Sequence, residues 1–192
     1  MALKPGERRL QILQTIAGML EQPKGEKITT AVLAARLELS EAALYRHFAS
    51  KAQMFEGLIE FIEQTVFGLT NKITAEETSG LKQAEAIVAM LLGFAQKNRG
   101  MTRVLIGDAL VNEDVRLQAR INQLLDRLET TLKQALRIAA SQGELHGDVD
   151  AGAHANLLLS YVVGRWHTFA KSGYARDPMA QWPQQWPLLS GR

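Results

Sequence analysis

The sequence contains no cysteine among its 192 residues. This absence excludes a disulfide framework, a zinc site built on thiolates and a cysteine nucleophile, and it fits a reducing compartment. No run approaches the roughly 18 uninterrupted apolar residues of a transmembrane helix. Charged residues precede any apolar run in the opening stretch MALKPGERRLQIL, so we expect no signal peptide. These absences predict a soluble cytoplasmic protein.

Motifs of the common enzyme classes are missing as well. The sequence has no P-loop, no GxGxxG and no GxSxG, and no carboxylate pair is expected in an apolar cleft. His146 and His154 lie near Asp148 and Asp150, but a solvated loop explains this group better than a metal site does. We therefore expect no enzymatic activity, no cofactor and no metal.

The charge of the sequence is unevenly distributed. Hydrophobic residues make up 46% of the chain and charged residues 22%, which allows a sizeable core in one large or two small domains. The formal net charge is only +2, yet residues 1–51 carry +3 and residues 52–192 carry −1. A mildly positive N-terminal part is compatible with an anionic partner at that end.

Apolar residues recur at spacings of three and four through most of the chain, and no strand-like alternation is long enough to build a sheet. The pattern predicts an all-α protein. We expect a three-helix domain over residues 1–51 and a larger helical domain, for regulation and dimerisation, over residues 52–192. The expected helices span about 7–22, 30–37, 41–47, 51–74, 81–97, a short segment after Arg99-Gly100, 113–142 with Asn112 as its N-cap, 149–171, and one short helix between the prolines of WPQQWP, 182–187.

The expected helix over 149–171 is apolar on all sides. A helix of this kind must be covered on more than one side. The simplest cover is a second copy of the chain, so we expect a homodimer formed through this helix and the C-terminal segment.

The stretch SEAALYRHF, residues 40–48, mixes apolar side chains that suit a core with polar side chains that suit a surface. Together with residues 29–37 it predicts two short helices, with Thr29 and Ser40 as their N-caps. A tight turn joins them and the first helix braces them, which is the helix-turn-helix arrangement. Leu44 and Phe48 lie four residues apart and would face the core. The other face would meet DNA in the major groove, where the second helix of such a motif lies.

The side chains on that outer face suit DNA. Arg46 can donate two parallel hydrogen bonds to a guanine, and the alanines beside it, Ala42 among them, allow close approach to thymine methyl groups. Phosphate contacts suit the remaining polar residues at helix ends, which are Thr29, Thr30, Tyr45, His47 and Lys51. Such contacts fix the register of the protein on DNA, while Arg46 would select the sequence.

The run ITTAVLAARLELSEAALYRHFASKAQMFEGLI resembles the DNA-binding domain of the TetR family, over about 50 residues. Four stretches, two of them overlapping this run, resemble the family's nucleoid occlusion factors: SEAALYRHF, SKAQMFEGLIEFIE, LLGFAQKNRGMTRVLIGDAL and RLQARINQLLDRLE. This resemblance implies a dimer that binds dispersed palindromic chromosomal sites and, on DNA, inhibits assembly of the division protein FtsZ. It also implies a nucleoid-associated location.

Carried over by position, the resemblance assigns DNA contacts to the seven residues named above, Thr29, Thr30, Ala42, Tyr45, Arg46, His47 and Lys51. It assigns the surface that meets FtsZ to Leu91, Gly93, Lys97 and Asn98. The basic arm before the first helix is short, with only Lys4, Arg8 and Arg9.

Two other functions remain open at this point. A ligand-responsive transcriptional repressor, the commoner role in the TetR family, would admit a small molecule between the helices of about 81–142 and 149–171. A helix-turn-helix that serves protein contacts alone is the third alternative. The expected helix faces are filled with Leu, Ile and Ala, which favours the division role over a ligand pocket.

Overall fold

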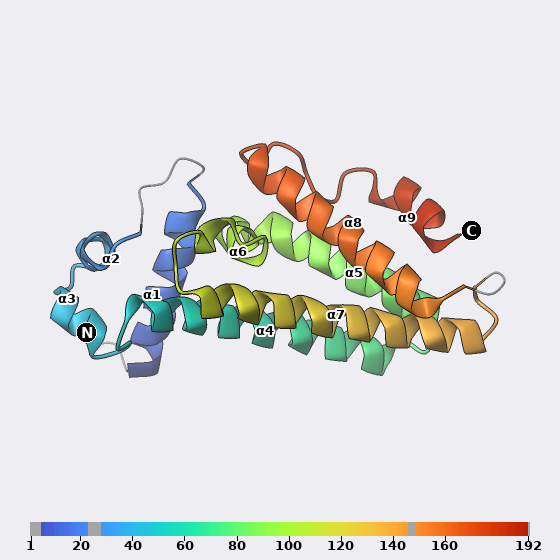
Figure 1. Ribbon diagram of the computed structural model, residues 1–192, viewed down its shortest axis with the longest axis horizontal. Coiled ribbons are helices and arrows are strands. Elements are labelled where there is room, and N and C mark those ends of the chain that lie inside the picture. Colours follow the sequence, from blue (N-terminus) through green and yellow to red (C-terminus); the bar gives the residue numbers. More distant parts are fainter. Residues whose placement is uncertain (1–4, 23–27, 146–148, 192) are drawn as a thin grey trace. The chain divides into compact units, whose positions relative to one another are not determined.

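A computed structural model describes residues 5–22, 28–145 and 149–191. These residues form helices and connections without any strand, which confirms the all-α prediction. The elements, shown in Figure 1, are α1 (Pro5–Leu20), α2 (Thr30–Arg36), α3 (Glu41–Tyr45), α4 (Lys51–Glu76), α5 (Gly80–Lys97), α6 (Arg99–Leu105), the 3-10 turn η1 (Asp108–Leu110), α7 (Val115–Ser141), α8 (Ala151–Lys171) and α9 (Trp182–Ser190).

The chain forms two compact units that interleave along the sequence. The first unit comprises Met1–Ile62 and Asn98–Ile121, and the second comprises Glu63–Lys97 and Asn122–Arg192. Helices α4 and α7 each contribute residues to both units. The expected boundary between residues 51 and 52 lies inside the first unit, at the start of α4.

The first unit holds the three-helix motif together with α6. Gly100 lies where α6 meets α1, and a Cβ atom at this position would come within 1.9 Å of the Ala17 carbonyl oxygen. Only glycine permits so close an approach of the two backbones. The core of this unit includes side chains that are at most 2% exposed: Ile12, Ile16, Leu33, Leu44, Phe48, Phe55 and Leu58.

The second unit is centred on the packing of α5 against α8 (Figure 1). Trp166 of α8 is fully buried, and its indole Nε1 donates a hydrogen bond to the Leu91 carbonyl of α5 at 3.0 Å. Gly80 at the start of α5 meets α7, where a Cβ atom would come within 2.2 Å of the Ala139 nitrogen. Apolar side chains fill this core, among them Ile87, Val88, Leu92, Leu158 and Val162.

Three local expectations from the sequence are wrong. Asn112 does not cap α7: it has φ 68°, and Asp114 accepts the Arg116 N–H at 3.0 Å instead. The C-terminal helix does not lie between the prolines, because α9 continues through Pro187. His154 is not in a solvated loop, since it is buried in α8 with Nε2 2.7 Å from the Leu189 carbonyl; His146 and Asp148 lie outside the described residues.

In the described part of the chain, no helix is both long enough and apolar enough to cross a membrane.

Candidate nucleic-acid interface

Side-chain caps fix the two short helices of the motif. The Thr29 hydroxyl accepts the Val32 N–H at 3.2 Å, and the Ser40 hydroxyl accepts the Ala43 N–H at 3.2 Å. Both N-caps were expected from the sequence, because threonine and serine satisfy the free amides of a first helical turn. Between the helices, Glu38 adopts φ 54°, which turns the chain sharply out of α2.

Helix α3 presents one face to the core and one to solvent. Leu44 is fully buried and Phe48 is 2% exposed. Ala42, Tyr45 and Arg46 are exposed, with Tyr45 at 45%. Three of the seven expected DNA contacts therefore lie on one outer face of α3, where side chains can reach base edges and phosphates.

The other helix-end residues are partly engaged within the fold. The Thr30 hydroxyl donates to a Glu41 carboxylate oxygen at 2.5 Å, which links the start of α2 to the start of α3. Thr29 uses its hydroxyl as a cap, as described above. His47 is half-buried just beyond α3.

Arg9 has a role that sequence reasoning did not find. Its Nη1 donates to the His47 carbonyl oxygen at 2.6 Å, and its guanidinium lies 4.2 Å from the centre of the Phe48 ring. Arg9 thus secures the chain after α3 to α1, instead of extending as part of a basic arm. The contact joins residues 38 positions apart, so no local spacing signals it. Of the other arm residues, Arg8 donates to Gln11 and Lys4 lies outside the described residues.

Lys51 begins α4, and its first turn is capped by Ser50 and Gln53. The Ser50 hydroxyl accepts the Gln53 N–H at 3.2 Å, while the Gln53 side chain accepts the Ala49 N–H at 2.9 Å. These reciprocal bonds hold the helix start much as a capping box does. The Lys51 ammonium forms an ion pair with Glu113 and lies 5.6 Å from the centre of the Phe55 ring.

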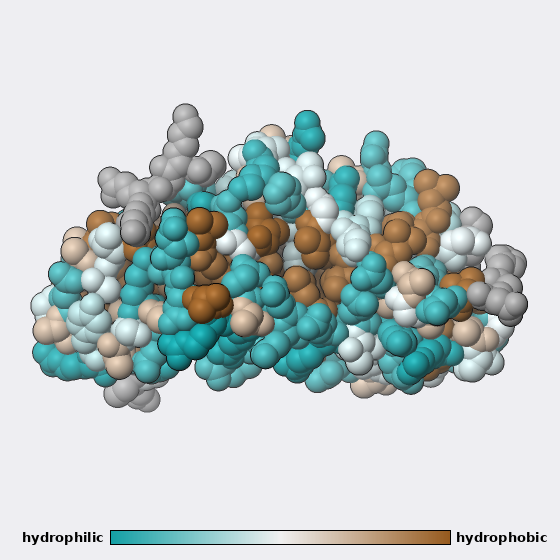
Figure 2. Space-filling view, in the orientation of Figure 1, coloured by the Kyte–Doolittle hydropathy of each residue, from teal (hydrophilic) through white to brown (hydrophobic). Residues whose placement is uncertain are grey.

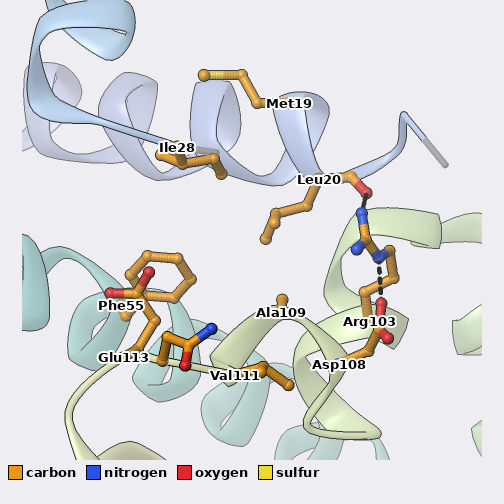
Figure 3. Close-up of a pocket in the computed structure, with 10 residues that line it drawn as sticks. Met19, Leu20, Ile28, Phe55, Arg103, Asp108, Ala109, Val111 and Glu113 are labelled. Atoms are coloured by element: carbon orange, nitrogen blue, oxygen red, sulfur yellow. Dashed lines mark hydrogen bonds and ion pairs between the residues drawn. The ribbon is translucent and has the colours of Figure 1, made fainter. Parts of the chain in front are cut away.

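A pocket of about 190 Å³ opens beside this ion pair in the first unit. Figure 3 shows Arg103 on one side of it, where its guanidinium donates to the Leu20 carbonyl at 3.1 Å and to Asp108 at 2.8 Å. Phe55 and Glu113 also line the pocket (Figure 3). Arg103 thereby binds the Leu20 carbonyl at the end of α1 and holds the segment that follows α6.

The residues expected to meet FtsZ differ in their exposure. Leu91 is fully buried, so its side chain cannot form part of a surface. Gly93 is half-buried with open space around it, and Lys97 is exposed in the last turn of α5. Asn98 belongs to the first unit, where its carbonyl accepts both the backbone N–H and the hydroxyl of Thr102 at 2.9 Å.

Family models match both parts of the chain. Residues 25–58 match the N-terminal domain of bacterial regulatory proteins of the tetR family. Residues 78–192 match the SlmA-like, tetracyclin repressor-like C-terminal domain. The second match includes the segment beyond about residue 145, where inspection of the sequence finds little resemblance.

Curated relatives match over nearly the whole chain. The nucleoid occlusion factor SlmA of Alteromonas mediterranea is 51% identical over 96% of this chain and 95% of its own length. The nucleoid occlusion factor SlmA of a Marinomonas species is 47% identical over 99% of this chain and 96% of its own.

Among solved structures, the fatty acid degradation regulator FadR of Bacillus halodurans superposes with a TM-score of 0.80 at 16% identity, covering 98% of this chain and 97% of its own. This likeness shows the fold alone. The two family matches and the relatives together show that the chain belongs to the TetR family and, within it, to the SlmA nucleoid occlusion factors.

Proposed function

We propose that this protein binds dispersed palindromic sites on the chromosome as a homodimer and inhibits assembly of FtsZ near the nucleoid. The observation that carries the proposal is the near full-length identity of about 50% to nucleoid occlusion factors. The exposed face of α3, with Tyr45 and Arg46, supports the DNA-binding part.

On DNA, α3 enters the major groove with Arg46 directed at a guanine and Ala42 close to thymine methyl groups. Tyr45, His47 and Lys51 contact phosphate oxygens. Thr29 and Thr30 act at the start of α2, where the backbone amides also face an anion favourably. A two-fold dimer would place two such helices in successive major grooves, about 34 Å apart.

The dimer forms through α8 and α9 in this proposal. The outward side of α8 carries a groove of about 560 Å³ lined by Leu159, Ser160, Val163, Gly164, His167 and Thr168. Leu157 of α8 is 53% exposed and Leu188 of α9 is 80% exposed. Figure 2 shows apolar side chains among polar ones over the region that α8 and α9 occupy in Figure 1. Small residues in the groove would let a second α8 approach closely, which supports an isologous contact.

The FtsZ contact falls on the exposed side of α5. Gly93 and Lys97 lie four residues apart on this helix and so share a face. Half-buried Ala86, Ala89 and Met90 lie on the same side, which gives a strip of apolar residues ending at Lys97. Such a strip suits an extended segment that carries apolar and acidic side chains. Asn98 provides a further contact in this proposal. Leu91 is buried and supports the strip only through the core.

The test of this function is FtsZ sedimentation with GTP, in the presence of the protein and a DNA duplex selected by the wild-type protein from random sequences. We expect less polymer with protein and duplex together. Lys97→Glu should restore the polymer while leaving duplex affinity unchanged. Lys82→Glu is the matched control, because Lys82 is exposed at the opposite end of α5. Equal polymer loss with wild type and Lys97→Glu would remove Lys97 from the contact.

A map of the protein on its own chromosome separates this function from that of a local repressor. Many dispersed sites, thinned around the replication terminus, are expected for nucleoid occlusion. One or two promoter sites, especially beside its own gene, would instead support a ligand-responsive repressor.

A further inference from the structure

The residue proposed to anchor phosphate at the start of α4 is already paired with an acid. The Lys51 ammonium contacts a Glu113 carboxylate oxygen, and the two side chains are 23% and 15% exposed. The pair is therefore partly shielded from water and is weakened less by salt than a fully exposed pair would be. The two residues lie 62 positions apart, both in the first unit.

A carboxylate oxygen and a phosphate oxygen would bind the Lys51 ammonium group in the same way. Each is an anion that accepts charge-assisted hydrogen bonds from the ammonium group. If Lys51 turns to a phosphate of the DNA backbone, it must loosen or give up its contact with Glu113. A phosphate drawn close to the intact pair would also meet the negative charge of Glu113, and like charges at short distance repel.

Glu113 is held in place by the segment between η1 and α7. Its backbone N–H donates to the Leu110 carbonyl at 3.0 Å, and Asn112 before it has φ 68°. The turn η1 before this segment is fixed at its start by the ion pair between Arg103 and Asp108 (Figure 3). The carboxylate is thus presented to Lys51 by a turn that is anchored at its start.

We propose that Glu113 competes with a DNA phosphate for Lys51 and thereby lowers the affinity of the free protein for DNA. This inference rests on the proposed DNA-binding function and adds to it an internal acid that mimics phosphate. Linkage makes the effect reciprocal: DNA releases Glu113, and anything that holds Glu113 on Lys51 weakens DNA binding.

The experiment measures binding of a fluorescein-labelled 30-base-pair duplex of mixed sequence by anisotropy, at low and moderate salt. The proteins compared are the wild type, Glu113→Gln, Lys51→Ala and the double variant. Asp114→Asn is the matched control. It also removes one negative charge, next to Glu113 in the sequence, but Asp114 pairs with Arg116 and not with Lys51. The Arg116 hydrogen bond holds the pKa of Asp114 at about 2, so this acid is charged at neutral pH.

We expect Glu113→Gln to bind the duplex about two- to fivefold more tightly than both the wild type and Asp114→Asn. Lys51→Ala should bind more weakly than the wild type, and adding Glu113→Gln to it should give no further gain. Circular dichroism melts establish that each variant is folded, and Glu113→Ala provides a second variant if Glu113→Gln is not.

Two results would overturn the inference while leaving DNA binding intact. In the first, Glu113→Gln binds no more tightly than Asp114→Asn, so that only net charge matters. In the second, the gain persists without Lys51, so that Glu113 acts on DNA directly. A wild-type protein that binds no duplex at all would instead refute the proposed function, and the inference with it.

Discussion

Arg46 stands at the end of α3 with its side chain exposed. Within the described part of the chain, its guanidinium makes no hydrogen bond or ion pair, so DNA meets no internal competitor for it. Lys51 differs, because its ammonium group is paired with Glu113. A residue that selects bases gains from being free, because its hydrogen bonds to guanine then displace only water.

Arg46→Ala should cost about 1–3 kcal/mol of binding to the preferred site and should relax its sequence preference. The measurement is a titration of the preferred duplex and of a scrambled duplex. Arg176→Ala removes the same charge from the second unit and should change neither affinity. Unchanged discrimination between the two duplexes in Arg46→Ala would assign base selection to another residue.

Sequence reasoning found the residues whose roles are local and missed those whose roles are not. Ser40 and Thr29 were predicted as caps because a cap acts within three residues, and the structure confirms both. Arg9 and Glu113 act on residues 38 and 62 positions away, so no spacing in the sequence reveals them. Leu91 was placed on a surface, but the Trp166 side of α5 is covered by α8.

At the scale of elements, the approach of α6 to α1 depends on Gly100. Gly100→Ala would drive a methyl group into the Ala17 carbonyl and should destabilise the protein by about 1–3 kcal/mol or more. Gly18→Ala, on α1 with nothing within 4 Å of the added atom, should stabilise it by about 0.5–1 kcal/mol. Thermal melts of both variants measure these effects. Changes in Tm of the same sign and size would contradict the prediction.

The start of α8 should give a pH-dependent contribution to stability. Hydrogen bonds from the Ala153 and Gly152 amides lower the pKa of Asp150 below its ordinary value of 3.8. A carboxyl with a lowered folded pKa stabilises the fold above its unfolded pKa, and this contribution is lost as pH falls through the folded value.

Asp150→Asn keeps a capping side chain but cannot titrate. Its Tm should therefore lie below that of the wild type at neutral pH, and the gap should close in acid below about pH 3.8. Melts at a series of pH values measure the gap. A gap that stays constant across the series would show that ionisation of Asp150 does not contribute.

Helical periodicity predicted the order of the helices well, because each amphipathic face follows from local sequence. It failed where a turn residue resembles a cap. Asparagine is common both as an N-cap and in left-handed turns. Only the packing of the segment before α7 selects the second role for Asn112.

At the scale of the whole molecule, dimerisation through α8 predicts that the dimer is sensitive to a charge at Val163. Val163→Glu would place a charge in the groove proposed to receive the second copy and should yield monomers. Gln134→Glu adds the same charge on the exposed side of α7 and should leave the dimer intact. Analytical ultracentrifugation distinguishes the two outcomes. A dimeric Val163→Glu protein would place the interface elsewhere.

The sequence predicts a DNA-binding domain over residues 1–51 and a larger helical domain over residues 52–192, divided at a single point. The structure instead returns Asn98–Ile121 to the N-terminal unit, because Gly100 lets α6 pack on α1. Such an interleaved division depends on backbone contacts between distant segments, and no change in composition marks it.

All three tryptophans, Trp166, Trp182 and Trp186, belong to the second unit. Indole emission excited at long wavelength therefore reports on that unit alone, and α3, which contains no tryptophan, gives no signal. Tyr45→Trp would add a single reporter on α3. Comparing its signal with that of the wild type during chemical denaturation would show whether the two units unfold together or one after the other.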